Sequence, residues 1–200
     1  MNINKESYNK ICDRWHESRS RSAINRCIAE FCAYLKPNAH VLDIGCGTGY
    51  PVASYLAEQG FSVTGIDISE KMIEKAKALR LPRADFMVKD VLDFKPAEKY
   101  DGVIAFDSLW HIPMENQAEL YELIASFMKI GGYFLFTHGK TKGSVSGEMY
   151  GEMFYYSALN REDVHKLLND NGFRLLSSVE NYAEETTGDR ELLIAAEKVR

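Results

Sequence analysis

The feature of this sequence that most constrains its fold is an alternation of short β-rich runs with segments of helical periodicity. Runs rich in β-branched and aromatic residues lie at 40–45, 61–67, 84–90, 100–108 and 133–139. Between and after these runs, apolar residues recur every three or four positions, which is the spacing of one face of a helix. Because a strand, a crossover helix and a second strand pack as a parallel pair, the alternation predicts a parallel sheet with helices on both faces.

The two ends of the chain complete this fold. Two helices are predicted before the first strand, and the second of them ends at Pro37 and Asn38. The last two strands, 173–182 and 191–199, are joined by a turn-rich segment rather than a helix, which predicts an antiparallel hairpin at one edge of the sheet. The expected fold class is therefore α/β: a Rossmann-like, doubly wound, mostly parallel sheet of seven strands with an antiparallel C-terminal hairpin.

At 200 residues the chain is long enough to bury a core of its own, and we expect a single domain. Its expected parts are N-terminal helices at 1–36, a ligand-binding core at 37–139, an insertion at 140–158 and a C-terminal helix and hairpin at 159–200. The insertion shows neither the helical nor the strand periodicity of apolar residues and is predicted to be a long loop. Its methionine and aromatic side chains at 149–156 admit two interpretations, packing against the sheet or a cover over a substrate.

Composition and charge argue against several classes of function. A net charge of −5 does not suit a protein that coats nucleic acid, which normally presents a basic face. The longest apolar run, 192–196, is far shorter than the roughly 20 residues that cross a bilayer, and the N-terminus lacks the apolar core of a signal peptide. The four cysteines have no paired spacing and predict reduced thiols rather than a metal site. We expect a cytoplasmic protein with no metal, no membrane and no nucleic-acid partner, either a monomer or a homodimer.

A glycine-rich turn follows the first predicted strand. Gly45, Gly47 and Gly49 alternate there, and the absence of Cβ atoms lets the backbone bend tightly and touch a ligand. Asp67 ends the second strand, where a carboxylate can accept hydrogen bonds from both hydroxyls of a ribose. Asp90 ends the third strand, in position for the amino group of an adenine. Together these residues predict a pocket for an adenosine derivative.

The spacing of the glycines disfavours a dinucleotide. A dinucleotide fingerprint reads G-x-G-x-x-G/A, whereas this turn reads G-x-G-x-G with Tyr50 in place of the final small residue. The succession VLDIGCGTG, GIDIS, KDVLDF, YDGVIAFDSLWHIP and GGYFLFTHG resembles instead the class I S-adenosylmethionine-dependent methyltransferases. The resemblance covers about residues 40–140 in motifs and the remainder in architecture only.

The resemblance implies that S-adenosylmethionine is the cofactor and that residues at the strand ends hold it. Asp67 would bind the ribose hydroxyls, and Asp90 with the Val91 amide would contact the adenine edge. Phe106 and Asp107 would lie below the sulfonium. The residues implied in cofactor binding are Asp43, Gly45, Cys46, Gly47, Gly49, Asp67, Ile68, Asp90, Val91, Phe106, Asp107, Tyr8 and Trp15.

The resemblance also implies that the N-terminal helices form a lid over the cofactor. Tyr8, Arg14 and Trp15 would supply its contacts. Tyr8 and Trp15 share a helical stripe with Ile11 and Cys12, so packing in the core is an equally good interpretation of both aromatic residues. Arg19 and Arg21 are expected to be solvated residues of a linker, with contact to an acidic substrate as the alternative.

The function implied is transfer of a methyl group, by in-line displacement, to a small molecule whose acceptor atom stays open. His111 and His138 are candidate general bases, because each follows a strand whose end faces the expected cleft, although a structural histidine is the commoner case. The D/N-P-P-Y/F motif of many amino-group methyltransferases is absent. Two rival hypotheses remain, an NAD(P)-dependent oxidoreductase on a similar fold and a non-catalytic S-adenosylmethionine-binding regulator.

Overall fold

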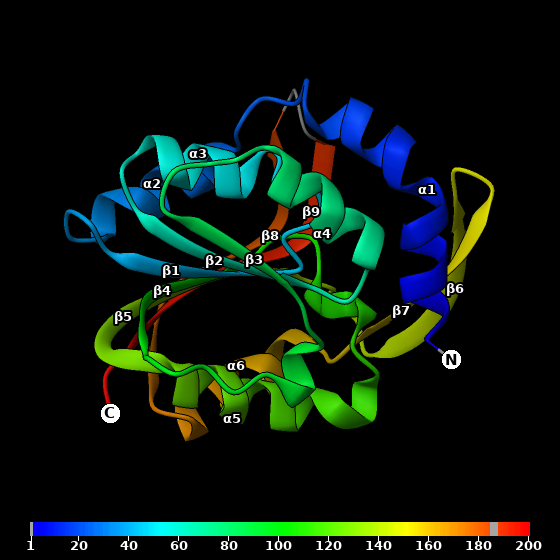
Figure 1. The fold of residues 1–200 in the computed structure, drawn as a ribbon. Helices are drawn as coiled ribbons and strands as arrows, with labels where there is room; N and C mark the ends of the chain where they lie inside the picture. The colour runs from blue at the N-terminus through cyan, green and yellow to red at the C-terminus, as the bar shows by residue number, and fades with distance from the viewer. Residues whose placement is uncertain (1, 185–187) are drawn as a thin grey trace.

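The computed structural model describes residues 2–184 and 188–200 and contains the predicted sheet (Figure 1). Seven strands pair in the order β3-β2-β1-β4-β5-β9-β8. They are β1 (His40–Ile44), β2 (Ser62–Asp67), β3 (Ala84–Val88), β4 (Tyr100–Ala105), β5 (Met128–His138), β8 (Phe173–Glu184) and β9 (Gly188–Lys198). The strands β6 (Gly143–Met149) and β7 (Glu152–Ala158) pair only with each other among the described residues.

Six α-helices and three short 3-10 turns connect the described strands. They are α1 (Ile3–Arg19), α2 (Arg26–Tyr34), α3 (Val52–Glu58), α4 (Glu70–Ala78), η1 (Val91–Asp93), η2 (Leu109–His111), η3 (Met114–Asn116), α5 (Gln117–Phe127) and α6 (Arg161–Asp170). Helices α2, α3 and α4 cover one face of the sheet, and α5 and α6 cover the other (Figure 1). Within the described ranges, no helix has both the length and the apolar composition that crossing a bilayer requires.

The strand order reverses at the centre of the sheet. β1 pairs in parallel with both β2 and β4, and β3 and β5 extend the parallel part outward on either side. β9 is antiparallel to β5 and to β8, which confirms the predicted C-terminal hairpin at one edge. Because the chain runs from β1 out to β3 and then returns to β4 on the other side of β1, the carboxyl ends of β1 and β4 border the crevice in which ligands bind in open α/β sheets.

Local signals in the sequence explain where the helices start and stop. The Ser69 side chain accepts a hydrogen bond from the Met72 amide at 3.1 Å and caps α4. Asn160 caps α6 in the same way, accepting from the Asp163 amide at 2.7 Å. Gly60 ends α3 with a φ of +87°, the left-handed conformation that glycine adopts without strain.

The segment 140–158 corrects one expectation, because most of it forms the β6–β7 hairpin rather than a loop. Met149 pairs with Glu152, and the two residues between them, Tyr150 and Gly151, have φ values of +55° and +85°. Positive φ at both central residues is the signature of a type I′ turn, whose twist matches that of the two strands. The hairpin was missed because Tyr-Gly is not one of the usual Asn-Gly or Gly-Gly turn sequences.

Helix α5 ends at Phe127, and β5 begins at the next residue, Met128. Met128 is 1% exposed and pairs with Tyr100 of β4, with a register shift before the next pair. The buried Met128 thus belongs to the sheet, and Gly131 and Gly132 lie within the irregular start of the strand.

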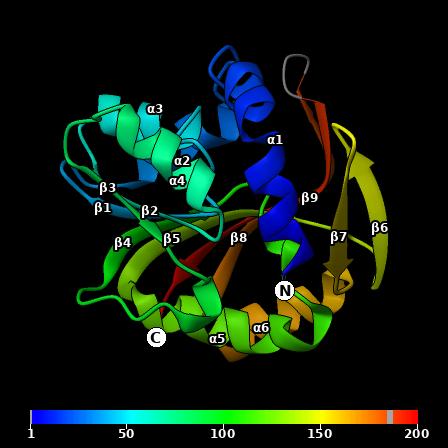
Figure 2. The ribbon, with the colours of Figure 1, turned by 45° about the vertical axis from the view of Figure 1, so that its right-hand side comes forward.

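Helix α1 lies across one end of the sheet, between α4 and the β6–β7 hairpin (Figure 2). Its buried Ile11 and Cys12 form a small apolar core with Met72 of α4 and Phe154 of β7. Phe154 has no exposed surface. The hairpin therefore serves as a wall against which α1 packs.

This packing predicts that Phe154→Ala destabilises the protein by about 3–5 kcal/mol, the usual cost of removing a buried aromatic side chain. The matched control is Val145→Ala on the same hairpin, where the side chain is 64% exposed and the change should stay within about 0.5 kcal/mol. Urea unfolding measures both. A loss below about 1 kcal/mol for Phe154→Ala would show that the hairpin does not support α1 as described.

Candidate active site

A cavity opens where the strand order reverses, at the carboxyl ends of β1, β2 and β4. Its volume is about 1240 Å³, counting the part that is open to solvent. The walls come from the glycine-rich turn, from the residues that follow the strands and from α1. The predicted residues that line it are Tyr8, Trp15, Asp43, Gly45, Cys46, Gly47, Asp67, Ile68, Asp90, Val91, Phe106, Asp107 and His111.

The glycine-rich turn is held by packing and by a carboxylate. A Cβ at Gly45 would lie 2.4 Å from the Ser108 Cβ, so this position excludes any side chain. A Cβ at Gly47 would lie 3.3 Å from the Trp15 Nε1, and the φ of +54° at Gly47 favours glycine as well. Gly49 corrects an expectation: it is not among the cavity-lining residues, and a Cβ there would meet Leu79 of the α4 region at 2.9 Å.

Asp67 connects this turn to the start of α4. Its Oδ2 accepts a hydrogen bond from the Gly47 amide at 3.0 Å, and its Oδ1 accepts from the Ser69 amide at 2.9 Å. Burial raises the pKa of Asp67 to about 6, and the hydrogen bonds from the backbone amides act in the opposite direction. Asp67 therefore stabilises the turn while its carboxylate lines the cavity.

Asp43 is the most unusual group in the cavity wall. The residue is 2% exposed, and its Oδ2 has no hydrogen-bond partner among the described residues. Burial raises its pKa to about 8, and the nearby Asp67 charge adds to the effect. A buried carboxylate oxygen without a donor is costly, and a ligand that brings a cationic donor such as an ammonium would remove that cost.

The end of β3 carries Asp90, which lines the cavity and also caps the short turn η1. Its Oδ1 accepts a hydrogen bond from the Leu92 amide at 3.0 Å. The capping bond orients the carboxylate, and Val91 lines the cavity beside it. The structural and the ligand-binding interpretations of Asp90 are therefore compatible.

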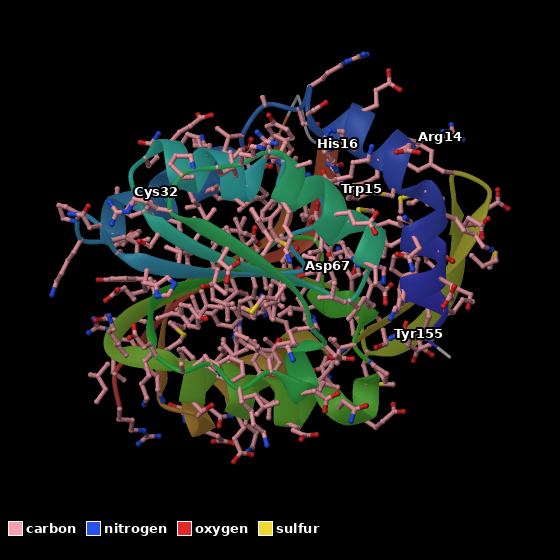
Figure 3. The ribbon with its side chains drawn as sticks, viewed as in Figure 1. Arg14, Trp15, His16, Cys32, Asp67 and Tyr155 are labelled. Carbon is pink, nitrogen blue, oxygen red and sulfur yellow. The ribbon has the colours of Figure 1, made fainter. Side chains whose placement is uncertain are left out.

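Helix α1 covers the cavity, and its apolar stripe serves both as a lid and as part of the core. Tyr8 and Trp15 line the cavity, whereas Ile11 and Cys12 are buried in the core behind them. Figure 3 shows Trp15 on α1, above Asp67, which lies near the centre of the view. The lid position predicted for these two aromatic residues is thus where the structure places them.

Two arginines of this region differ from expectation. Arg14 does not line the cavity: its guanidinium lies 4.5 Å from the centre of the Tyr150 ring of the hairpin turn. Arg19 was expected in a solvated linker, but it ends α1, lines the cavity and lies 4.3 Å from the Trp15 ring. The helix is longer than its apolar stripe, which is why its last turn was read as a linker.

His111 lies at the edge of the cavity and connects three elements. Its Nδ1 is 2.9 Å from the Tyr155 carbonyl oxygen, so this nitrogen donates its proton there. Its Nε2 is consequently the acceptor, and the Tyr8 hydroxyl donates to it at 2.8 Å. Burial lowers the pKa of His111 to about 4, which leaves the imidazole neutral near pH 7.

His138 corrects an expectation, because it does not face the cavity. It is 1% exposed, its Nδ1 lies 2.7 Å from the Gly139 oxygen, and its Nε2 lies 3.2 Å from the Gln117 Oε1. Burial lowers its pKa. These contacts are those of a structural histidine that ties β5 to α5, because the side chain at this strand end points toward the helix.

Sequence reasoning missed the ion pair at the end of β4. Arg190 of β9 binds both carboxylate oxygens of Asp107, with Nε donating to Oδ1 at 3.0 Å and the terminal nitrogen to Oδ2 at 2.6 Å. Thr137 adds a hydrogen bond to Oδ1 at 3.2 Å. Arg190 was read as part of a turn, and only the pairing of β9 with β5 brings it to the cavity, so no local signal could have found it.

The raised pKa of Asp43 predicts how stability depends on pH. The native state keeps this proton up to a pKa of about 8, whereas an unfolded aspartate loses it near pH 4, so the free energy of unfolding contributed by this group falls as the pH rises between these values. Asp43→Asn should remove that fall. We expect the free energy of unfolding of the variant, minus that of the wild type, to rise by more than about 1 kcal/mol from pH 5 to pH 8. Urea unfolding without ligand measures both values. Parallel pH profiles for the two proteins would contradict the assignment.

Comparison with known proteins identifies the family. A family described as "Methyltransferase domain" matches residues 15–178 of the chain. An O-methyltransferase, resE, of Aspergillus sclerotiorum is 27% identical over 175 residues, which cover 80% of this chain and 65% of that protein. The magnesium-protoporphyrin O-methyltransferase of Synechocystis sp. is 32% identical over 152 residues, with 70% and 64% covered. The chain spans between about half and two thirds of the length of the curated relatives that it matches.

Solved structures share the fold. A Burkholderia thailandensis 1,6-didemethyltoxoflavin-N1-methyltransferase, with bound 1,6-didemethyltoxoflavin and S-adenosylhomocysteine, superposes with a TM-score of 0.75 at 21% identity, over 98% of this chain and 87% of that one. Magnesium protoporphyrin IX methyltransferase from Synechocystis, with bound S-adenosylmethionine, gives a TM-score of 0.73 at 24% identity, over 97% and 94%. Because the family match covers most of the residues and includes every strand end that lines the cavity, this chain belongs to the family of methyltransferase domains.

Proposed function

We propose that this protein is an S-adenosylmethionine-dependent methyltransferase that acts on a small molecule. The observation that carries the proposal is the cavity wall itself, in which the unpartnered Asp43 oxygen, the glycine-rich turn and Asp67 lie together under α1. Family membership supports methyl transfer as the reaction. The position of the cavity beneath α1 supports a small acceptor rather than a polymer.

The residues in the cavity wall fit the proposed cofactor. The buried Asp43 oxygen would accept from its ammonium, and Asp67 would accept from its ribose hydroxyls. Asp90 and the Val91 amide would bind the adenine edge. When bound, S-adenosylmethionine supplies an activated methyl group, so the protein contributes position and exclusion of water rather than bond activation. Positioning of this kind is worth up to roughly 7–11 kcal/mol.

Helix α1 would exclude water from the reacting atoms. Trp15 lies over the glycine-rich turn and Tyr8 lies at the opposite end of the same helix face. Because water competes with the acceptor for the methyl group, a closed helix favours transfer to the acceptor over hydrolysis.

The Tyr8–His111 pair supplies a base for an acceptor that carries a proton. Nε2 of His111 is its unprotonated nitrogen and already accepts the Tyr8 hydroxyl proton at 2.8 Å. As an acceptor hydroxyl gives its proton to the Tyr8 oxygen, Tyr8 passes its own proton to Nε2, so the proton count balances. The names of the similar O-methyltransferases support oxygen as the acceptor atom.

Ligand binding tests the proposed cofactor. S-adenosylhomocysteine should raise the melting temperature of the protein, whereas NAD should not, because the turn lacks the dinucleotide spacing. Asp67→Ala should weaken S-adenosylhomocysteine binding by about 2–3 kcal/mol in calorimetry, since two hydroxyls lose a charged acceptor. Asp85→Ala, an exposed change on β3, is the matched control and should bind as the wild type does. Stabilisation by NAD alone would instead support an oxidoreductase.

The base is tested separately from cofactor binding. His111→Asn and Tyr8→Phe should each lower the turnover of methyl-labelled S-adenosylmethionine with a metabolite extract by about 10²-fold or more, because each interrupts the proton path. Affinity for S-adenosylhomocysteine should change less than about threefold in His111→Asn. His138→Asn is the control, since His138 lies outside the cavity wall. Full turnover in His111→Asn would show that the acceptor needs no base from this pair.

A further inference from the structure

The side chain of Asn9 lies where α1 meets the start of α4. Its Oδ1 accepts two hydrogen bonds, from the Ser69 hydroxyl at 2.7 Å and from the Lys71 amide at 3.1 Å. Its Nδ2 donates to the Glu70 Oε2 at 3.1 Å. Asn9 therefore binds three successive residues at the beginning of α4, although it lies far from them in the sequence.

The other side of that contact is the predicted ribose site. Ser69 has no exposed surface, and its amide donates to Asp67 Oδ1 while its hydroxyl donates to Asn9. Asp67 Oδ2 in turn holds the Gly47 amide. One contiguous set of hydrogen bonds thus runs from the glycine-rich turn through Asp67 and Ser69 to α1.

The residue before Asn9 faces the other end of the cavity. Tyr8 donates to His111, and one turn earlier on α1 the buried Asn4 pairs with both backbone groups of Tyr155, at 2.8 Å and 2.9 Å. Tyr8 and Asn9 are adjacent on one rigid helix. A movement of α1 that breaks the Asn9 contacts therefore also moves the Tyr8 hydroxyl away from His111.

We propose that Asn9 is a positioning residue that couples the cofactor side of the cavity to the Tyr8–His111 pair through the docking of α1. This inference rests on the proposed function, because it takes the Asp67 side of the cavity to be the cofactor side. Helix α1 has two states, docked and lifted, and binding at Asp67 favours the docked one. The coupling is reciprocal, so an acceptor bound at His111 strengthens cofactor binding by the same factor.

Ion pairs around α1 do not replace Asn9 in this role. Lys5 pairs with Glu70, Lys75 with Asp13 and Lys10 with Glu152, but all of these pairs are partly exposed to solvent. Exposed pairs contribute little because water and salt screen them. By contrast, the hydrogen bond to Asn9 is donated by the hydroxyl of Ser69, which has no exposed surface.

The test uses two probes, one for the docking of α1 and one for the Tyr8–His111 contact. A residue that only stabilises the protein would not change the response of both probes to the ligand. The chain has two tryptophans, so Trp110→Phe leaves Trp15 on α1 as the only fluorescent indole, and its quenching by acrylamide measures the docking of α1. The imidazole NMR signal of His111, assigned by its loss in His111→Asn, reports on the Tyr8 contact. Both are recorded with and without S-adenosylhomocysteine, in the wild type and in three variants.

In the wild type, S-adenosylhomocysteine should protect Trp15 from acrylamide and shift the His111 signal. Asn9→Ala should bind the ligand about fivefold more weakly, the equivalent of one hydrogen bond, and at saturation should lose both responses. The double variant Asn9→Asp, Glu70→Gln keeps the acceptor oxygen, exchanges the donor and acceptor between the two side chains, and should retain both responses. Lys10→Ala, which removes only the exposed pair with Glu152, is the matched control and should respond as the wild type does.

The outcomes separate this inference from the proposed function. Equal His111 shifts in the wild type and in Asn9→Ala at saturating ligand would overturn the coupling while leaving the cofactor assignment intact. Loss of the responses in Lys10→Ala as well would overturn the specific role of Asn9. Failure of the wild type to bind S-adenosylhomocysteine would overturn the proposed function, and this inference with it.

Discussion

The carboxylate of Asp67 is the interaction on which the rest of the site depends. It accepts hydrogen bonds from the Gly47 amide and the Ser69 amide, so one side chain fixes both the glycine-rich turn and the first residues of α4. A buried carboxylate is costly unless donors surround it, and here backbone amides provide them. The same group is thereby presented to the cavity in a fixed orientation, which is what selective binding of a ribose requires.

The cavity without a ligand holds two buried carboxyl groups whose charged forms burial disfavours. Burial raises the pKa of Asp43 and of Asp67, and the nearby Asp67 charge raises the pKa of Asp43 further. Asp107, in contrast, has its own buried partner in Arg190. The carboxyl group without a partner therefore lies beside the glycine-rich turn, and a ligand with a cationic group would stabilise its ionised form. Such sites trade stability of the free protein for affinity, as functional sites commonly do.

The predictions from sequence succeeded where a single strand or helix carried its own signal and failed where two distant segments had to meet. The strand ends at Asp43, Asp67 and Asp90 were found because strand periodicity is local and parallel strands place their carboxyl ends together. His138 was misplaced, because whether a side chain at a strand end points to the cavity or to a helix depends on the pleat within the assembled sheet. Arg190 and the β6–β7 hairpin were missed because their roles depend on pairing across the chain.

The sequence by itself determined the strands and helices of the seven-stranded sheet, the glycine turn and the acidic strand ends, because each follows from local periodicity and from the steric freedom of glycine. Only the tertiary structure decided which of these residues share a cavity. Docking α1 between α4 and β7 brings Tyr8 to His111 and Asn9 to Ser69, contacts between residues far apart in the chain. Such contacts result from the burial of apolar faces such as Ile11 against Phe154, and burial is a property of the whole packed chain rather than of any segment of it.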